Sequence, residues 1–168
     1  MIISLTGFMG CGKTSVGRRL ATLLSVPFID LDDYIQGNTG KKIPELFAVS
    51  EAHFRAEEAR CLREVIAGGG DLILALGGGA IMTPANADLI SGYTTCIYLE
   101  ASVETLLENL ACSHERPLLK GQDMRSRIEE LMQKRESTYR RYADITVDTN
   151  GKAPMPLAKE IVEILNKR

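Results

Sequence analysis

Short runs of uninterrupted apolar residues alternate along this chain with longer segments in which apolar residues recur at helical spacing. The apolar runs predict strands at residues 2–5, 28–29, 72–76, 95–99 and 145–147. The longer segments predict helices at residues 14–24, 43–67, 103–110, 123–142 and 157–165, and another helix that begins at Pro84. Strands without a polar face are typical of a parallel sheet that is covered on both sides. The pattern therefore predicts an α/β fold, a three-layer α/β/α sandwich around a five-stranded parallel sheet with right-handed crossovers.

Length, charge and cysteine spacing narrow the class of protein. No repeat, low-complexity tract or linker divides the 168 residues, so we expect one domain over residues 1–168. The net charge of -2 gives no overall attraction to nucleic acid or membrane, and no apolar run approaches the roughly 18 residues of a membrane span. The first predicted strand leaves no room for a signal peptide before it, and the widely spaced cysteines favour reduced thiols in a cytoplasmic protein. We expect a monomer, because no extra apolar face is evident.

The stretch GFMGCGKTS, residues 7–15, lies between the first predicted strand and the first predicted helix. It matches the pattern G-x-x-x-x-G-K-S/T, whose backbone N–H groups and helix N-terminus surround the phosphates of a nucleotide. In this pattern Lys13 reaches the β- and γ-phosphates and the Thr14 hydroxyl ligates Mg²⁺. A plain glycine-rich turn is the alternative, but the position between a strand and a helix favours a phosphate site. No base-reading or water-positioning motif of a switch GTPase follows, and motor proteins are normally longer.

Polar and glycine residues follow the second and third predicted strands, and ligands of such sheets bind at the carboxyl ends of the strands. Asp30 and Asp32 would face the same side of an extended backbone, one holding a Mg²⁺-bound water and the other accepting a hydroxyl proton. Alternatively, one of these aspartates caps the next helix. Gly77, Gly78 and Gly79 would let a polar substrate approach bare backbone, whereas a plain turn needs only one glycine.

Several arginines have no role that spacing alone assigns. Arg55 lies one helical turn from acidic residues, which is typical of a solvated ion-pair face. Arg116 precedes a proline in a polar stretch at residues 111–121 that predicts a loop, and Arg135 belongs to a basic helical segment. Most arginines in such places are solvated, so a binding role needs further support.

Taken together, the motifs resemble those of shikimate kinases, in the nucleoside-monophosphate-kinase structural family of P-loop kinases. The matching pieces keep the family's order over nearly the whole chain: GFMGCGKTS, FIDLDDYI, EAHFRAEE, LALGGGAI, ERPLLKG and KRESTYRRYAD with VDTN. The resemblance implies a P-loop kinase fold and ATP-dependent phosphorylation of the 3-hydroxyl of shikimate, with Mg²⁺, in aromatic amino-acid biosynthesis. Its partners would be shikimate and ATP, with no nucleic acid and no membrane.

On the nucleotide side, the resemblance implies that ATP is bound by Gly10, Cys11, Gly12, Lys13, Thr14, Ser15, Arg116 and Lys152. Lys13 would steady the transferring phosphoryl group. Arg116, on a mobile lid at about residues 111–121, would stabilise charge on the phosphates. Mg²⁺ would be held by Thr14 and, through water, by Asp30.

On the acceptor side, the resemblance implies a shikimate pocket made of Asp32, Arg55, Glu58, Gly77, Gly78, Gly79 and Arg135, with a helical region at about residues 31–67. Asp32 would bind the substrate hydroxyl and take its proton. Arg55 and Arg135 would clamp the shikimate carboxylate by a fork-to-fork pairing that lysine cannot reproduce. Glu58 would orient its neighbours in the pocket. The expected catalytic residues are Lys13, Asp32 and Arg116.

The chain also departs from the family pattern near the nucleotide. Asn109 stands where the family often has an adenine-contacting arginine, and Lys152 would supply a second basic contact, so we expect the ATP KM to change more than the chemistry. Cys11 lies inside the loop, where a helix N-terminus favours a reactive thiolate. Phe47 and Phe54 are either pocket wall or core.

Two other classes of function stay open on the residues alone. One is another small-metabolite kinase on the same scaffold, such as a gluconate or nucleoside-monophosphate kinase. A monophosphate kinase needs basic residues for a substrate phosphate and a pocket for a second base, whereas Asp32 and a single carboxylate clamp suit a polyol acid. The other class is a non-catalytic nucleotide-binding regulator, against which the joint presence of Lys13, Thr14, Asp32 and Arg116 argues.

Overall fold

Five parallel strands form the centre of the protein, in the order β2-β3-β1-β4-β5. The computed structural model describes residues 1–111 and 123–168. The strands are β1 (Ile2–Thr6), β2 (Phe28–Asp30), β3 (Leu72–Ala75), β4 (Thr94–Glu100) and β5 (Ile145–Asp148). The helices are α1 (Lys13–Leu24), α2 (Leu31–Thr39), α3 (Ile43–Val49), α4 (Glu51–Gly68), the 3-10 turn η1 (Ala80–Met82), α5 (Pro84–Tyr93), α6 (Val103–Ala111), α7 (Met124–Tyr142) and α8 (Pro154–Asn166). All five predicted strands are present within two residues of their predicted ends.

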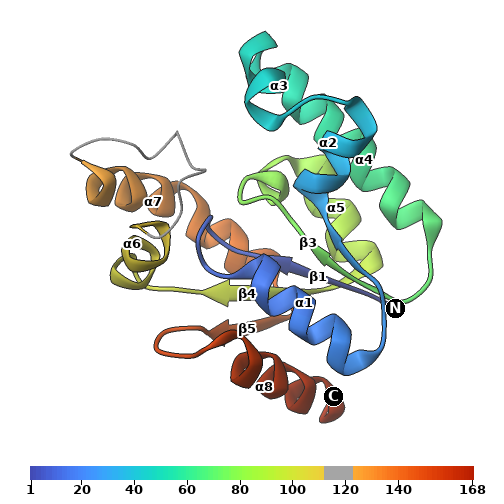
Figure 1. The fold of residues 1–168 in the computed structure, drawn as a ribbon, viewed down its shortest axis with the longest axis vertical. Coiled ribbons are helices and arrows are strands. Elements are labelled where there is room, and N and C mark those ends of the chain that lie inside the picture. The colour runs from blue at the N-terminus through green and yellow to red at the C-terminus, as the bar shows by residue number, and fades with distance from the viewer. Residues whose placement is uncertain (112–122) are drawn as a thin grey trace.

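Helices cover both faces of the sheet, as the apolar strands predict (Figure 1). All residues of β1 and β3 are buried. Ile3 and Leu5 of β1 pack into a core with the apolar stripes of α1 and α8, whereas Ile2 packs into a second core with α4 and α5. Successive side chains of a strand point to opposite faces, so a strand in the middle layer buries every position, and it is therefore mostly apolar. The three-layer α/β/α sandwich is therefore confirmed.

The prediction that residues 43–67 are largely helical is confirmed, and Ser50 divides this stretch into α3 and α4. Ser50 has an extended backbone, with φ of -176°, and its side chain accepts a hydrogen bond from the backbone N–H of His53 at 2.9 Å. A serine that caps one helix in this way cannot continue the helix before it. The break lets α3 lie at an angle to α4, at the top of the molecule in Figure 1.

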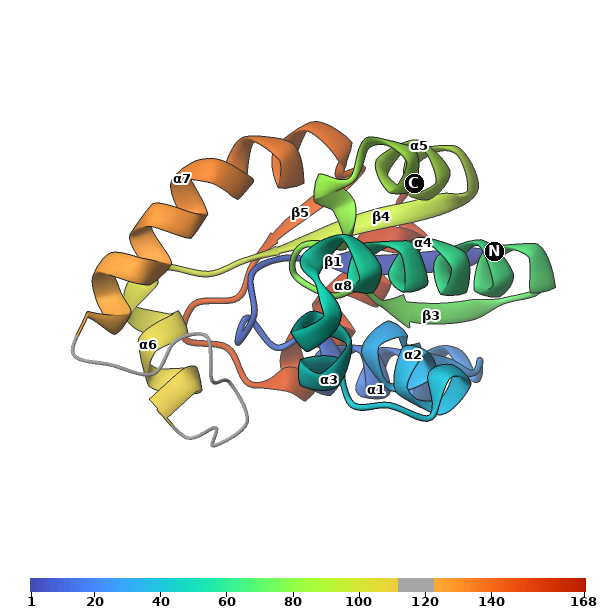
Figure 2. The ribbon, with the colours of Figure 1, turned by 90° about the horizontal axis from the view of Figure 1, so that it is seen from above.

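The carboxyl ends of β1, β2 and β3 meet at one edge of the sheet, where the loop after β1, the start of α2 and residues 77–79 lie together. Figure 2, seen from above, shows α2, α3 and α4 on one side of this edge and α6 and α7 on the other. The candidate site lies between these groups of helices. No helix in the described ranges 1–111 and 123–168 is long and apolar enough to cross a membrane.

Candidate active site

The loop between β1 and α1 is folded tightly around its own backbone. Gly7 has φ of +147°, and a Cβ placed on it would lie 2.8 Å from the carbonyl oxygen of Leu99. Gly12, with φ of +101°, is the N-cap of α1. Both positions need glycine, the first for conformation and space and the second for conformation. The loop thereby presents backbone N–H groups and the positive end of α1 to one point, which is an anion site.

Lys13 and Thr14, at the start of α1, face this loop and the end of β2. The Lys13 ammonium donates hydrogen bonds to the carbonyl oxygens of Gly7 at 2.6 Å and Phe8 at 3.1 Å. The Thr14 hydroxyl donates to Oδ2 of Asp30 at 2.8 Å. A cation and a hydroxyl–carboxylate pair therefore lie on two sides of the loop.

Asp30 and Asp32 do not lie on one extended segment, so that expectation is wrong. Asp30 ends β2, and its Oδ1 accepts a hydrogen bond from the backbone N–H of Asp33 at 3.1 Å, which caps α2. Because the helix begins at Leu31, Asp32 lies in the first helical turn, and its carboxylate lies against Gly77. The capping alternative is confirmed for Asp30, which contacts Thr14 through its other oxygen.

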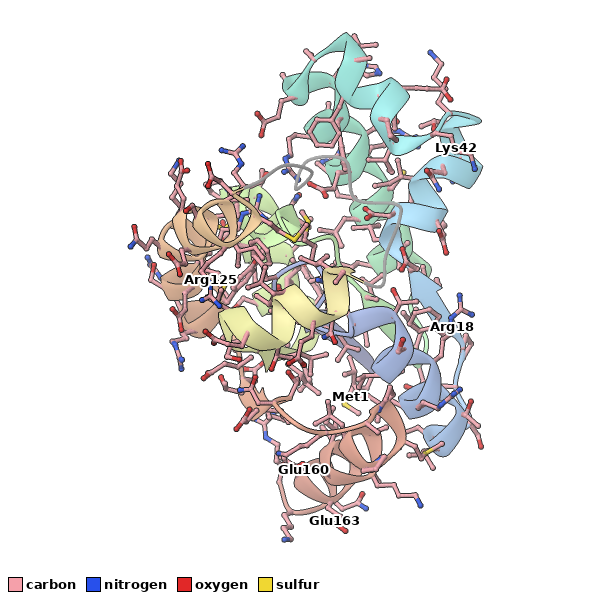
Figure 3. The ribbon with its side chains drawn as sticks, turned by 60° about the vertical axis from the view of Figure 1, so that its left-hand side comes forward. Met1, Arg18, Lys42, Arg125, Glu160 and Glu163 are labelled. Carbon is pink, nitrogen blue, oxygen red and sulfur yellow. The ribbon has the colours of Figure 1, made fainter. Side chains whose placement is uncertain are left out.

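A pocket of about 590 Å³ opens beside the loop. It brings together residues 10–16 with side chains of α6 and of the segment after β5, namely Thr105, Glu108, Asn109, Thr149 and Lys152. Asn109 donates its amide N–H to the carbonyl oxygen of Gly10 at 2.7 Å. Lys152 pairs with Glu160 of α8 at 3.1 Å, and Figure 3 labels Glu160. The pocket thus contains every residue predicted to bind ATP except Arg116, which lies outside the described residues together with nearly all of the predicted lid.

Each of the three glycines after β3 lies against a different predicted acceptor-side residue. A Cβ on Gly77 would lie 3.1 Å from Oδ1 of Asp32 and 3.3 Å from Oε2 of Glu58. A Cβ on Gly78 would lie 3.4 Å from Nη1 of Arg135. A Cβ on Gly79 would lie 2.5 Å from Nη2 of Arg55. None of the three has a positive φ, so close approach of charged side chains accounts for Gly77 and Gly79, whereas Gly78 has room for an ordinary contact.

Arg55 and Glu58 form an ion pair on α4, 2.7 Å from Nη1 to Oε1. The Glu58 side chain is only 1% exposed, so the expectation of a solvated ion-pair face is wrong here. Burial raises the pKa of the Glu58 carboxyl above its ordinary 4.5, while the charge of Arg55 opposes this rise. The Arg55 guanidinium also lies over the rings of Phe47 and Phe54, at 5.9 Å and 5.2 Å.

Arg135, on α7, approaches the same place from the opposite side of the site. Its guanidinium lies 5.8 Å from the ring centre of Phe8. Its Nη1 is buried and has no hydrogen-bond partner within the described ranges. Buried donors are nearly always paired, so a nitrogen without a partner in the described ranges makes Arg135 a candidate for binding a ligand.

Tyr139 also contacts this site, although no motif in the sequence points to it. Its hydroxyl donates to the carbonyl oxygen of Gly78 at 2.6 Å. The one signal available in the sequence is its position four residues after Arg135, on the same face of the helix.

The site therefore has two halves that meet at Gly78. One half is the phosphate loop with its lysine and its hydroxyl–carboxylate pair. The other half carries two arginines and two carboxylates around bare backbone, and a Cβ on Gly78 would lie 3.4 Å from the backbone nitrogen of Met9, which belongs to the loop. A phosphate donor and a polar acceptor can thus lie next to each other. The fold and this arrangement define a P-loop kinase.

Comparison with known proteins narrows the class. The family model described as "Shikimate kinase" matches residues 9–166. A shikimate kinase from Halorhodospira halophila is 42% identical over 164 residues, which cover 97% of this chain and 92% of the relative. A solved shikimate kinase from Acinetobacter baumannii in complex with shikimate superposes with a TM-score of 0.93 at 35% identity, covering 99% of this chain and 93% of the other. A solved shikimate kinase from Bacteroides thetaiotaomicron superposes with a TM-score of 0.91 at 30% identity, covering 99% of this chain and 98% of the other.

The chain belongs to the shikimate kinase family. It is an enzyme, a kinase that uses ATP as co-substrate and a hydroxyl group as acceptor. The resemblance drawn from the motifs is confirmed.

Proposed function

We propose that this protein transfers the γ-phosphoryl group of ATP to the 3-hydroxyl of shikimate and forms shikimate 3-phosphate in aromatic amino-acid biosynthesis. The observation that carries the proposal is the set of contacts at residues 77–79. There Asp32, Arg55 and Arg135 surround bare backbone that also touches the phosphate loop. An acceptor with one carboxylate and several hydroxyls matches two guanidinium groups, one carboxylate base and exposed peptide groups. The shikimate complex of the Acinetobacter baumannii relative supports this choice of acceptor.

In this proposal Arg55 and Arg135 hold the shikimate carboxylate. The buried Nη1 of Arg135, which has no protein partner in the described part of the chain, donates to one carboxylate oxygen. Arg55 forms an ion pair with the buried carboxylate of Glu58. Glu58 keeps the guanidinium oriented without competing for the substrate, because its carboxylate is buried beside Gly77.

Asp32 receives the proton of the attacking hydroxyl, and Lys13 supplies positive charge to the phosphates. Phosphoryl transfer through a loose transition state asks mainly for alignment and charge neutralisation, so an aspartate of ordinary basicity is sufficient. Asp32 lies against Gly77, in the same half of the site as both arginines. A substrate held there by its carboxylate presents its ring hydroxyls toward the loop that carries Lys13.

Thr14 and Asp30 fit a Mg²⁺ site. They offer a hydroxyl and a carboxylate oxygen 2.8 Å apart, and hard oxygen donors are what Mg²⁺ prefers. No group of three or more acidic, His or Cys side chains that could hold a metal ion lies among residues 1–111 and 123–168. A site of few protein ligands is typical of Mg²⁺ that is bound together with substrate phosphates. When bound, Mg²⁺ would neutralise charge on those phosphates, with Thr14 as a direct ligand and Asp30 acting through water.

The remaining expectations are part of the same proposal. Residues 1–168 would form one domain and residues 31–67 would bind shikimate. The predicted lid at about residues 111–121, with Arg116, lies almost entirely outside the described residues and stays a prediction. We propose a cytoplasmic monomer. Cys11, Cys61 and Cys96, the cysteines within the described ranges, are free thiols, which supports a reducing compartment.

The test is a coupled assay of ADP release with the purified protein and Mg·ATP. Shikimate, gluconate and a panel of nucleoside monophosphates are compared as acceptors at equal concentrations. The proposal predicts that shikimate stimulates ADP release far above the background hydrolysis and that the other acceptors do not. Stimulation by gluconate or a monophosphate instead of shikimate would identify another metabolite kinase, and no stimulation by any acceptor would support a nucleotide-binding regulator.

A further inference from the structure

Tyr139 lies on α7, one helical turn beyond Arg135, with its side chain fully buried. Its hydroxyl donates a hydrogen bond to the carbonyl oxygen of Gly78, and the 2.6 Å distance is short for this type of bond. The bond joins α7 to the loop after β3, two segments separated by 61 residues in sequence. It therefore restrains the backbone of Gly78 relative to the helix that carries Arg135.

The restrained peptide lies at the centre of the site. A Cβ on Gly78 would lie 3.4 Å from Nη1 of Arg135, 3.4 Å from the backbone nitrogen of Met9 and 3.6 Å from the carbonyl oxygen of Gly7. A shift of Gly78 by a few tenths of an ångström would change the position of the arginine relative to the phosphate loop. The hydroxyl of Tyr139 is thus bonded to the residue at which the two halves of the site meet.

A second buried tyrosine, Tyr98, allows the role of the Tyr139 hydroxyl to be distinguished from that of the Tyr139 ring. Tyr98 of β4 packs against Tyr139 with their ring centres 5.2 Å apart. The Tyr98 hydroxyl is buried and has no hydrogen-bond partner among residues 1–111 and 123–168. The two rings share one packing environment, but only the Tyr139 hydroxyl is bonded to a residue of the site. Packing of the rings therefore does not account for the bond to Gly78.

We propose that Tyr139 is a positioning residue, which holds Gly78 and Arg135 in the arrangement that binds the acceptor carboxylate. This inference rests on the proposed function, in which Arg135 binds that carboxylate. Burial raises the pKa of the Tyr139 hydroxyl to about 12, and the charge of Arg135 together with its side-chain hydrogen bond to Tyr139 opposes this rise. The hydroxyl therefore remains protonated and remains a donor at any pH suitable for the assay.

The experiment compares Tyr139→Phe with the matched control Tyr98→Phe. Loss of the Tyr139 hydroxyl leaves the Gly78 carbonyl unpaired beside the arginine, so we expect the KM for shikimate to rise about tenfold while the KM for ATP stays within about twofold. Tyr98→Phe removes a hydroxyl without a partner and should change neither KM. Because a KM does not depend on the fraction of active enzyme, the comparison is decisive even if Tyr139→Phe is less stable.

A double variant tests whether Tyr139 acts through Arg135. If it does, Tyr139→Phe combined with Arg135→Lys raises the KM for shikimate little more than Arg135→Lys alone. Effects that multiply, or an unchanged KM in Tyr139→Phe, would overturn the inference while the wild type phosphorylates shikimate normally. A wild type without shikimate-dependent ADP release would overturn the proposed function and this inference with it.

Discussion

Replacing Gly79 with alanine perturbs the acceptor site through one side chain. The added Cβ would lie 2.5 Å from Nη2, 3.0 Å from Cζ and 3.1 Å from Nη1 of Arg55. To restore an ordinary contact of 3.4 Å, the guanidinium has to move by about 1 Å. The guanidinium ends a flexible side chain, so the fold can accommodate this movement. Nη1 also forms the 2.7 Å bond to Glu58, and the movement disturbs that bond.

The size of the effect follows from the bonds that the displaced guanidinium weakens. A hydrogen bond to a charged group contributes about 1.5–3 kcal/mol, and about 1.4 kcal/mol is a factor of ten in affinity. We therefore expect Gly79→Ala to lower kcat/KM for shikimate by roughly 10- to 100-fold, mainly through KM. The KM for ATP should hardly change, because Arg55 lies outside the nucleotide pocket.

Steady-state kinetics with each substrate varied in turn provide the measurement, and Gly92→Ala provides the control. Gly92 lies near the end of α5, where a Cβ meets nothing within 4 Å, so alanine there should leave both KM values unchanged and stabilise the helix by about 0.5–1 kcal/mol. An unchanged KM for shikimate in a folded Gly79→Ala protein would contradict the role of Arg55. It would mean that Arg55 does not hold the acceptor.

Three further predictions concern the carboxylates and the thiol of the site. Asp32→Asn should lower kcat by about 10²- to 10⁴-fold with an unchanged KM for ATP, and a near-normal kcat would remove Asp32 from catalysis. Because the pKa of Glu58 is raised in the folded protein, the native state retains a proton that the unfolded chain has released at pH values just above 4.5. Glu58 should therefore make the free energy of unfolding decrease as pH rises through that window. Urea titrations of wild type and Glu58→Gln at several pH values measure this effect, and the free energy of unfolding of wild type should fall relative to that of the variant as pH rises. A difference between the two proteins that does not change with pH would contradict the raised pKa of Glu58. Alkylation of Cys11, which is buried in the phosphate loop, should inactivate the enzyme slowly, and ATP should protect against it. Full activity after proven modification of Cys11 would contradict a role of this residue in nucleotide binding.

The sheet and the phosphate loop are predictable from sequence because local patterns determine them. Uninterrupted apolar runs occur where both faces of a strand are covered, as at Leu72–Ala75. Glycine spacing with Lys13 and Thr14 identifies the loop wherever it follows a strand. These features depend on residues that are close in sequence.

Other features of the site depend on contacts between distant segments. Glu58 has the spacing of a solvated helix residue, and only the approach of Gly77 and the packing around α4 bury it. In the sequence Tyr139 is one polar aromatic residue in a basic helix, and only the fold shows that its hydroxyl contacts Gly78 in the loop after β3. The break at Ser50 and the start of α2 at Leu31 depend on the side chains of Ser50 and Asp30, which cap the helices that follow. The apolar pattern alone does not show whether such a residue caps a new helix or continues the preceding helix or strand.

The central claim is that the phosphoryl group goes from ATP to the 3-hydroxyl of shikimate. The most direct test is phosphorus–proton correlation NMR of the product formed by the purified enzyme from shikimate and Mg·ATP. We expect a phosphate monoester whose phosphorus couples to the ring proton at carbon 3. Coupling to the proton of another hydroxyl-bearing carbon, or inorganic phosphate as the only product besides ADP, would contradict it.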